Sequence, residues 1–150
     1  MQLVILIGVQ ATGKSSFCRR QFQDTHIRLN LDMLRTRHRE TILLDACLAA
    51  RQPVVMDNTN PTRMDRARYI EPARKAGFSI TGYFFESRLA DAIRRNSGRA
   101  GARRIPERGI RGTSGRLELP DRSEGFDKLY FVRLIEDSED FEVQDWLDEI

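Results

Sequence analysis

The sequence predicts an α/β domain with a mainly parallel central sheet of about five strands flanked by helices. Short apolar runs alternate with stretches of helical apolar spacing along the chain. Several runs lead directly into a glycine or an acidic residue, as expected where the carboxyl ends of parallel strands meet at one edge of a sheet. The strands are expected at residues 3–7, 27–30, 54–56, 78–85 and 129–134.

The segments between these strands have the apolar spacing of helices. Helices are expected at residues 14–23, 40–51, 61–76 and 89–96. Asn60 is expected to cap the helix that Pro61 opens, and Gly77 to end it. Near the end of the chain we expect a short amphipathic element that packs Trp146 on the domain. Its apolar residues are Phe141, Val143, Trp146, Leu147 and Ile150.

The composition is that of a soluble globular protein, with 40% hydrophobic and 31% charged residues in a length typical of one domain. No apolar run approaches the length of a membrane span, and the first residues lack the basic leader of a signal peptide. Cys18 and Cys47 are far apart and not in metal-ligand spacing. We therefore expect one cytoplasmic domain, residues 1–150, that does not associate with membranes.

Charge is distributed unevenly. Of the 25 basic residues, 22 are arginine, which grips phosphate in bidentate fashion better than lysine does. Residues 88–116 contain nine arginines and two acids, whereas residues 117–150 contain twelve acids and three basic residues. This pattern favours a basic site in the middle of the chain. The acidic end is better interpreted as a solvated face.

Residues 8–15 read GVQATGKS, a GxxxxGKS phosphate-binding loop between an apolar run and an expected helix. Its glycines let backbone N–H groups point at phosphate oxygens, and the helix start adds a positive dipole end. Lys14 is expected to meet the β- and γ-phosphates and Ser15 to bind Mg²⁺. The expected nucleotide-binding residues are Gly8, Gln10, Ala11, Thr12, Gly13, Lys14, Ser15 and Ser16. The motif specifies binding and not the reaction, and ATP is favoured over GTP because no NKxD signature is present.

Asp32 and Arg35 follow the second expected strand and are three residues apart, so in a helical turn they share one face. A kinase needs a carboxylate to take the acceptor hydroxyl's proton, and a phosphorylated acceptor needs a cation to hold its phosphate. The alternative is that Asp32 caps a helix and Arg35 forms a surface ion pair. The spacing does not decide between these interpretations.

Asp57 begins the polar segment Asp-Asn-Thr-Asn directly after a buried strand. An acidic residue in this position of phosphate-loop enzymes holds Mg²⁺ through water, so we assign Asp57 with Ser15 to the metal. A turn that caps the next helix is the alternative, and we apply it to Asn60 only.

An arginine-rich segment with interspersed glycines, residues 94–115, is expected to form a mobile lid over the phosphates. A lid arginine can neutralise charge on the transferring phosphoryl group. Arg95, Arg99 and Arg103 recur every four residues and are expected on one helical face. The alternative is a solvated basic loop.

Taken together, these residues resemble the kinase domain of polynucleotide 5′-hydroxyl kinases, a family with a P-loop fold. The resemblance covers nearly the whole chain and is carried by GVQATGKS, by LNLDMLR, by the segment VVMDNTNPTRMDRARYIEPARKAG, and by the IPE and EGF patches. It implies ATP and Mg²⁺ as cofactors, with Asp32 as the general base and Arg35 holding the acceptor's phosphate. The lid arginine would be one or more of Arg94, Arg95, Arg99 and Arg103, with Arg94 also placed at the nucleotide. The Asp-x-Asp phosphatase motif of many family members does not occur in these 150 residues, so only the 5′ step of end-healing is expected.

Three functional hypotheses follow. The leading one is ATP-dependent phosphorylation of a 5′-OH end of DNA or RNA, with that nucleic acid as the substrate partner. The first alternative is a P-loop kinase of a small hydroxylated acceptor, such as a nucleotide sugar or an antibiotic. The second is a non-catalytic nucleotide-binding regulator, in which Asp32 would only cap a helix.

Overall fold

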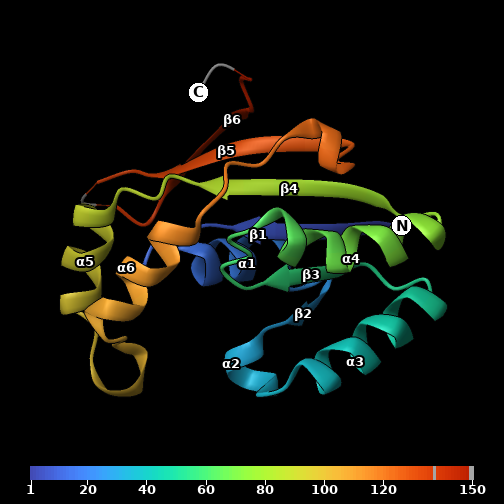
Figure 1. Ribbon diagram of the computed structural model, residues 1–150, viewed down its shortest axis with the longest axis horizontal. Coiled ribbons are helices and arrows are strands. Elements are labelled where there is room, and N and C mark those ends of the chain that lie inside the picture. Colours follow the sequence, from blue (N-terminus) through green and yellow to red (C-terminus); the bar gives the residue numbers. More distant parts are fainter. Residues whose placement is uncertain (137, 149–150) are drawn as a thin grey trace.

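The structure, a computed structural model, describes residues 1–136 and 138–148. Its strands form one six-stranded sheet in the order β2-β3-β1-β4-β5-β6 (Figure 1). All neighbouring pairs are parallel except β5 and β6. The expected α/β class is therefore confirmed, and a sixth strand is added. The strands are β1 Gln2–Ile7, β2 Ile27–Leu29, β3 Val54–Asp57, β4 Ser79–Phe85, β5 Lys128–Leu134 and β6 Phe141–Asp145.

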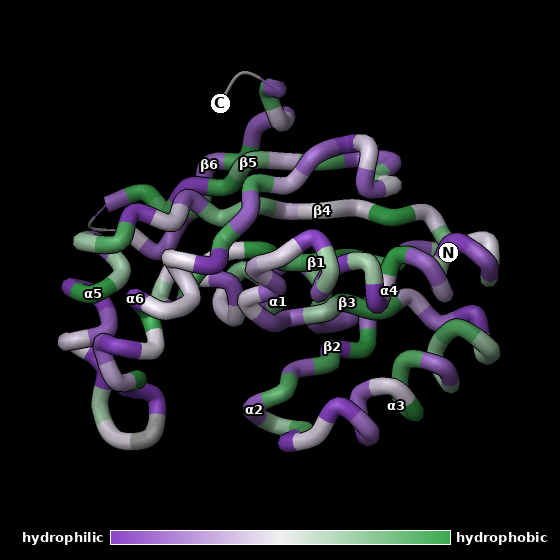
Figure 2. Tube along the Cα trace, in the orientation of Figure 1, coloured by the Kyte–Doolittle hydropathy of each residue, from purple (hydrophilic) through white to green (hydrophobic). Residues whose placement is uncertain are grey.

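Strand β1 lies in the middle of the sheet, and residues 3–7 are fully buried. Because side chains alternate along a strand, Leu3 and Ile5 enter one apolar cluster and Val4 and Leu6 another. Burial of both faces explains why residues 3–7 of β1 and 54–56 of β3 are continuously apolar. Figure 2 colours much of these strands green. Helices α3 and α4 supply residues to the first cluster and α1 to the second. These helices are α1 Lys14–Phe22, α3 Arg37–Ala49 and α4 Arg63–Lys75.

Helix α4 begins two residues later than expected, and Asn60 is not its cap. Thr62 is the N-cap, in a capping box with Asp65. Asn60 instead has a positive φ of 45°, and its side-chain amide donates to the carbonyls of Leu6 at 2.7 Å and Met56 at 3.3 Å. The assignment of Asn60 to capping was wrong because a non-local contact with the ends of β1 and β3 outweighs the local one.

The lid segment folds into more regular structure than its glycines indicate. It contains the end of α5 (Leu89–Ser97), the 3₁₀ turn η1 (Gly101–Arg103) and most of α6 (Glu107–Arg116). Helices α5 and α6 lie side by side at one end of the sheet (Figure 1), where Ala92 and Ile110 pack with Val9. Because α5 ends before Arg99, the expectation of Arg95, Arg99 and Arg103 on one helical face was wrong.

The expected amphipathic element near the end of the chain is strand β6, and Trp146 follows it directly. As expected, Trp146 packs on the domain, with only 5% of its surface exposed. Its backbone N–H donates to the Leu129 carbonyl at 3.0 Å, and its ring meets Phe84 edge-on at 5.4 Å between centroids. Ile150 lies outside the described residues. The turn η2 (Arg122–Glu124) precedes β5.

Across residues 1–136 and 138–148, no helix has both the length and the apolar character needed to cross a membrane.

We expect Trp146→Ala to lower the free energy of unfolding by about 3 to 5 kcal/mol, because a large buried side chain is lost from the main core. Leu147→Ala is the matched control: Leu147 is the next residue and is 59% exposed, so its truncation should cost less than about 0.5 kcal/mol. Urea unfolding measures both. Equal, small costs for the two variants would contradict the packing of Trp146.

Candidate active site

The loop at residues 8–13 connects β1 to α1 and is held by its neighbours. The Gly8 N–H donates to the Thr59 carbonyl at 3.0 Å, and the Val9 N–H donates to the Ser87 hydroxyl at 3.1 Å. Gly13 has a left-handed φ of 94°, and a Cβ there would lie 2.7 Å from the Phe141 ring. Only glycine satisfies both conditions, so the second glycine of the motif is required by the backbone and by β6.

Lys14 is the first residue of α1 and is buried. Its Nζ donates to the carbonyls of Gly8 at 2.8 Å and Val9 at 2.6 Å. Burial lowers the pKa of Lys14 to about 8; the carboxylate of Asp57 opposes this shift, and the nearby Arg99 adds to it. A bound polyanion would stabilise the charged ammonium form and raise the pKa of Lys14 again, so Lys14 suits a phosphate ligand.

The side chains of Ser15 and Asp57 meet at the ends of β1 and β3. The Ser15 hydroxyl donates to Asp57 Oδ2 at 3.1 Å, and Asp57 is buried. A hydroxyl and a carboxylate are the hard oxygen donors that suit Mg²⁺, so both expected metal residues fit that ion. Among the described residues, no group of three or more His, Cys, Asp or Glu side chains could hold a metal. The remaining ligands would therefore come from the nucleotide and water.

Arg28 of β2 also occupies this position, and the sequence analysis missed it. Its Nε donates to Asp57 Oδ2 at 2.7 Å, and its Nη2 lies 3.4 Å from the Ser15 hydroxyl. The parallel register pairs Arg28 with Val55, two residues before Asp57. The available signal was a single arginine between Ile27 and Leu29 in an otherwise apolar strand.

One cavity of about 650 Å³ is lined by Lys14, Ser15 and Asp57 but not by Arg28. Residues of the loop, of the short helix α2 (Leu31–Leu34) and of the lid segment line it. Five basic side chains and two carboxylates line it, so it favours an anionic ligand. The charged lining residues are Lys14, Arg19, Arg35, Arg99, Arg103, Asp32 and Asp57.

Asp32 and Arg35 are both exposed and line this cavity together with Lys14. Asp32 is not the cap of α2: the Asn30 side chain accepts the Met33 N–H. The helix ends at Leu34, and Arg35 follows it with a φ of 74°. The expectation that both residues share one helical face was therefore wrong, although the same cavity brings them together.

The start of α2 is fixed to the end of β3 by two hydrogen bonds. The Asn30 amide donates to the Asp57 carbonyl at 2.6 Å. The Leu31 N–H donates to the Asn58 side-chain oxygen at 2.9 Å. The backbone that carries Asp32 is thereby fixed relative to the Ser15–Asp57 pair.

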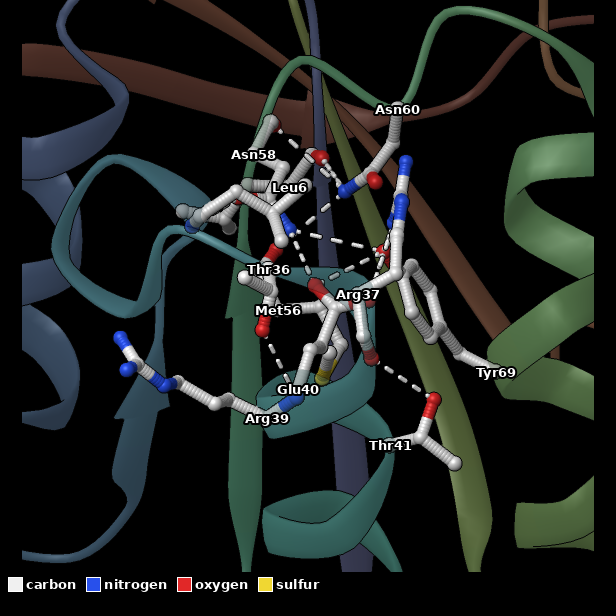
Figure 3. A network of polar contacts seen from close by, with 11 residues as sticks. Leu6, Thr36, Arg37, Arg39, Glu40, Thr41, Met56, Asn58, Asn60 and Tyr69 are labelled. Atoms are coloured by element: carbon white, nitrogen blue, oxygen red, sulfur yellow. Dashed lines mark hydrogen bonds and ion pairs between the residues drawn. The ribbon is translucent and has the colours of Figure 1, made fainter.

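Asn58 is held in turn by a buried carboxylate, Glu40 of α3 (Figure 3). The Asn58 amide donates to Glu40 Oε2 at 3.0 Å, the Tyr69 hydroxyl to Oε1 at 3.1 Å, and Arg37 to Oε1 at 2.9 Å. Burial and the Glu40 charge raise the pKa of Tyr69 to about 12, so its hydroxyl stays a donor. The sequence analysis missed Glu40 because most acidic residues of surface helices face solvent.

The four proposed lid arginines divide between two cavities. Arg99 and Arg103 line the cavity that contains Lys14, and burial, together with Arg103, lowers the pKa of Arg99. Arg95 reaches the Ala11 carbonyl at 3.5 Å. Arg94 pairs with Asp91 at 3.3 Å and Glu136 at 3.5 Å and, with Arg95, lines a second cavity of about 700 Å³. Arg94 is therefore separated from the cavity that contains Lys14.

The other loop residues differ in what they contact. Gln10, Ala11, Gly13 and Ser16 line the cavity, whereas the buried Thr12 donates its hydroxyl to the Val9 carbonyl at 2.9 Å. The Gln10 amide donates to Thr113 of α6 at 3.0 Å and so connects the loop to the lid segment.

The parallel sheet with a phosphate loop after its central strand defines a P-loop kinase fold. A family described as an AAA domain matches residues 3–120, and the chain belongs to that family. It is also 28% identical over 145 residues to the bifunctional polynucleotide phosphatase/kinase of Schizosaccharomyces pombe. That match covers 93% of this chain, which spans 36% of the relative's length. The resemblance to a polynucleotide kinase is thereby confirmed.

Solved structures with the same fold include a Kti12 protein and kinases of small molecules. Kti12 of Chaetomium thermophilum, in complex with ADP-AlF3, has a TM-score of 0.67 at 15% identity and covers 90% of each chain. A sugar kinase from Janibacter has a TM-score of 0.66 at 16% identity over 87% of this chain and 85% of its own. A gluconokinase from Sinorhizobium meliloti has a TM-score of 0.59 at 18% identity over 87% and 81%. At these identities the likeness establishes the fold alone.

We expect Tyr69→Phe to lower the free energy of unfolding by about 2 kcal/mol. The buried carboxylate of Glu40 would lose the hydrogen bond that the Tyr69 hydroxyl donates to it. Tyr130→Phe is the control, since Tyr130 is a half-buried tyrosine of β5 that stacks on Tyr83. It should change stability by less than about 0.5 kcal/mol. Denaturant unfolding distinguishes the variants, and a neutral Tyr69→Phe would contradict the Glu40 network.

Proposed function

We propose that this domain is an ATP-dependent polynucleotide kinase that transfers the γ-phosphate to the 5′-OH end of DNA or RNA. The observation that carries the proposal is that Asp32 and Arg35 line the same cavity as Lys14. A phosphate-binding loop, a carboxylate and a separate arginine then face one space, as transfer to a phosphorylated acceptor requires. The relative from Schizosaccharomyces pombe supports the same substrate class.

The residues of the loop would hold the nucleotide. Backbone N–H groups of residues 8–15 and the Lys14 ammonium would bind the β- and γ-phosphates. Ser15 and Asp57 would hold Mg²⁺, which supplies positive charge against the phosphates when it is bound. Arg99 and Arg103 line the cavity opposite α2 and would neutralise charge on the transferring phosphoryl group, with residues 94–115 as the lid.

The acceptor would enter between α2 and the lid segment. Asp32 would accept the proton of the 5′-OH as its oxygen attacks the γ-phosphorus, and ADP would leave with the electrons of the broken bond. Arg35 would grip the phosphate on the 3′ side of the same nucleotide and so align the hydroxyl. The fixed start of α2, held by Asn30 and Asn58, would keep both groups in register with the nucleotide.

The test offers labelled ATP with 5′-OH DNA, 5′-OH RNA and a panel of sugars and other small hydroxylated molecules. We expect transfer to the oligonucleotides. Asp32→Asn should lower turnover by about 10² to 10⁴-fold, because only the proton acceptor is lost, and should leave ATP affinity unchanged. Transfer to a small molecule alone would favour the small-acceptor kinase. ATP binding without any transfer would favour a non-catalytic regulator.

A second prediction concerns the acceptor's own phosphate. We expect a nucleoside 3′-phosphate to be a minimal acceptor and the plain nucleoside a very poor one. Arg35→Ala should lower kcat/KM for the 3′-phosphorylated acceptor by about 10²-fold, because the hydroxyl loses its alignment, with little change in KM for ATP. Arg35→Lys should rescue part of the loss, since lysine cannot make the bidentate grip. Steady-state kinetics give these values, and a wild-type enzyme indifferent to the 3′-phosphate would contradict the assignment of Arg35.

A further inference from the structure

The position expected for Mg²⁺ already contains a positive charge that belongs to the chain. Arg28 donates through Nε to Asp57 Oδ2 at 2.7 Å, and that oxygen also accepts the Ser15 hydroxyl at 3.1 Å. Arg28 Nη2 approaches the same hydroxyl at 3.4 Å. Both protein groups that suit the metal are thus bound to one guanidinium.

We infer that Arg28 is an internal cation that competes with Mg²⁺ for Ser15 and Asp57 and replaces it when nucleotide binds without metal. Mg²⁺ needs a nearly octahedral set of oxygen ligands and carries two charges. A guanidinium that holds Asp57 Oδ2 at 2.7 Å repels a dication bound beside the same oxygen, so metal binding there favours withdrawal of Arg28.

The surroundings allow Arg28 to exchange. Its side chain is 39% exposed, whereas that of Asp57 is 2% exposed, so the arginine can turn toward solvent while the carboxylate stays in place. The long side chain has the rotamer freedom for this movement, and no backbone change in β2 is needed. Arg28 therefore lowers the affinity for the metal without disturbing the sheet.

If Arg28 competes with Mg²⁺, removing Arg28 should change the nucleotide affinity in opposite directions with and without the metal. With Mg²⁺ present, removing Arg28 removes a repelling charge and should tighten nucleotide binding. Without Mg²⁺, removing Arg28 takes away the cation bound to Ser15 and Asp57, two residues that line the cavity, and should weaken nucleotide binding. A residue with a purely structural role would shift both affinities in the same direction.

This inference rests on the nucleotide binding of the proposed function. Its test is the affinity of wild type and Arg28→Gln for a non-hydrolysable ATP analogue, measured by calorimetry in EDTA and in excess MgCl2. For Arg28→Gln we expect weaker binding in EDTA and tighter binding in MgCl2. The ratio of the dissociation constant in EDTA to that in MgCl2 should therefore rise about tenfold or more above the wild-type ratio. Arg28→Lys, which keeps the charge, should remain close to wild type.

Arg20→Gln is the matched control, because Arg20 is an α1 arginine whose partners are Glu139 and Asp140, away from Asp57. It removes the same charge and should leave the ratio unchanged. The inference on Arg28 is overturned, and the proposed function stands, if the ratio of the dissociation constants in EDTA and MgCl2 is the same for wild type and Arg28→Gln. The same holds if the substitution shifts both affinities in one direction. If the wild-type protein binds no analogue in either condition, both are overturned.

Discussion

The parallel pairing of β1 and β3 determines where each group of the candidate site lies. Asp57 is paired with Leu6 in this register, and the ends of the two strands are joined again by the Asn60 amide and by the bond from Gly8 to the Thr59 carbonyl. Buried polar groups of this kind are costly unless they are paired, so the two strand ends hold one arrangement. The phosphate-binding loop that leads to Lys14 starts at the end of β1, and Asp57 and Asn58 at the end of β3 anchor α2. A one-residue shift between these strands would separate Ser15 from Asp57 and detach α2 from its anchor.

The parts of the fold that the sequence predicts well are those determined by local pattern. Continuous apolar runs identify the buried strands, and the GxxxxGKS motif at residues 8–15 combines turn glycines with a helix start, so its shape follows from adjacent residues. Strand β6 was harder to predict because its residues are largely exposed and its pairing with β5 is antiparallel at the sheet edge. The helical order in the lid segment was also missed, since α6 contains three glycines and is stabilised by packing rather than by propensity.

The candidate site shows the same division. Asp32 and Asp57 could be proposed from the sequence because they lie just after or at the end of a strand, and the carboxyl ends of parallel strands meet at one edge. Arg35 was proposed from its three-residue spacing from Asp32. The partners of the site residues could not be predicted, because they come from distant parts of the chain. Arg28 contacts Asp57 from a neighbouring strand, and Glu40 of α3 holds Asn58. Asn60 shows how a local rule fails: an asparagine before a proline fits a helix cap, yet a contact with Leu6, 54 residues away, determines its conformation.

The charged residues that line the cavity determine which ligands it favours. The cavity is lined by Lys14 and four arginines against two carboxylates, and burial lowers the pKa of Lys14. Like charges that line one cavity repel one another, and a ligand that carries several negative charges would relieve this repulsion. Asp57 is the exception, because Arg28 already balances it. Asp32 is the other carboxylate of the cavity and is exposed there, which suits the role of proton acceptor that we propose for it.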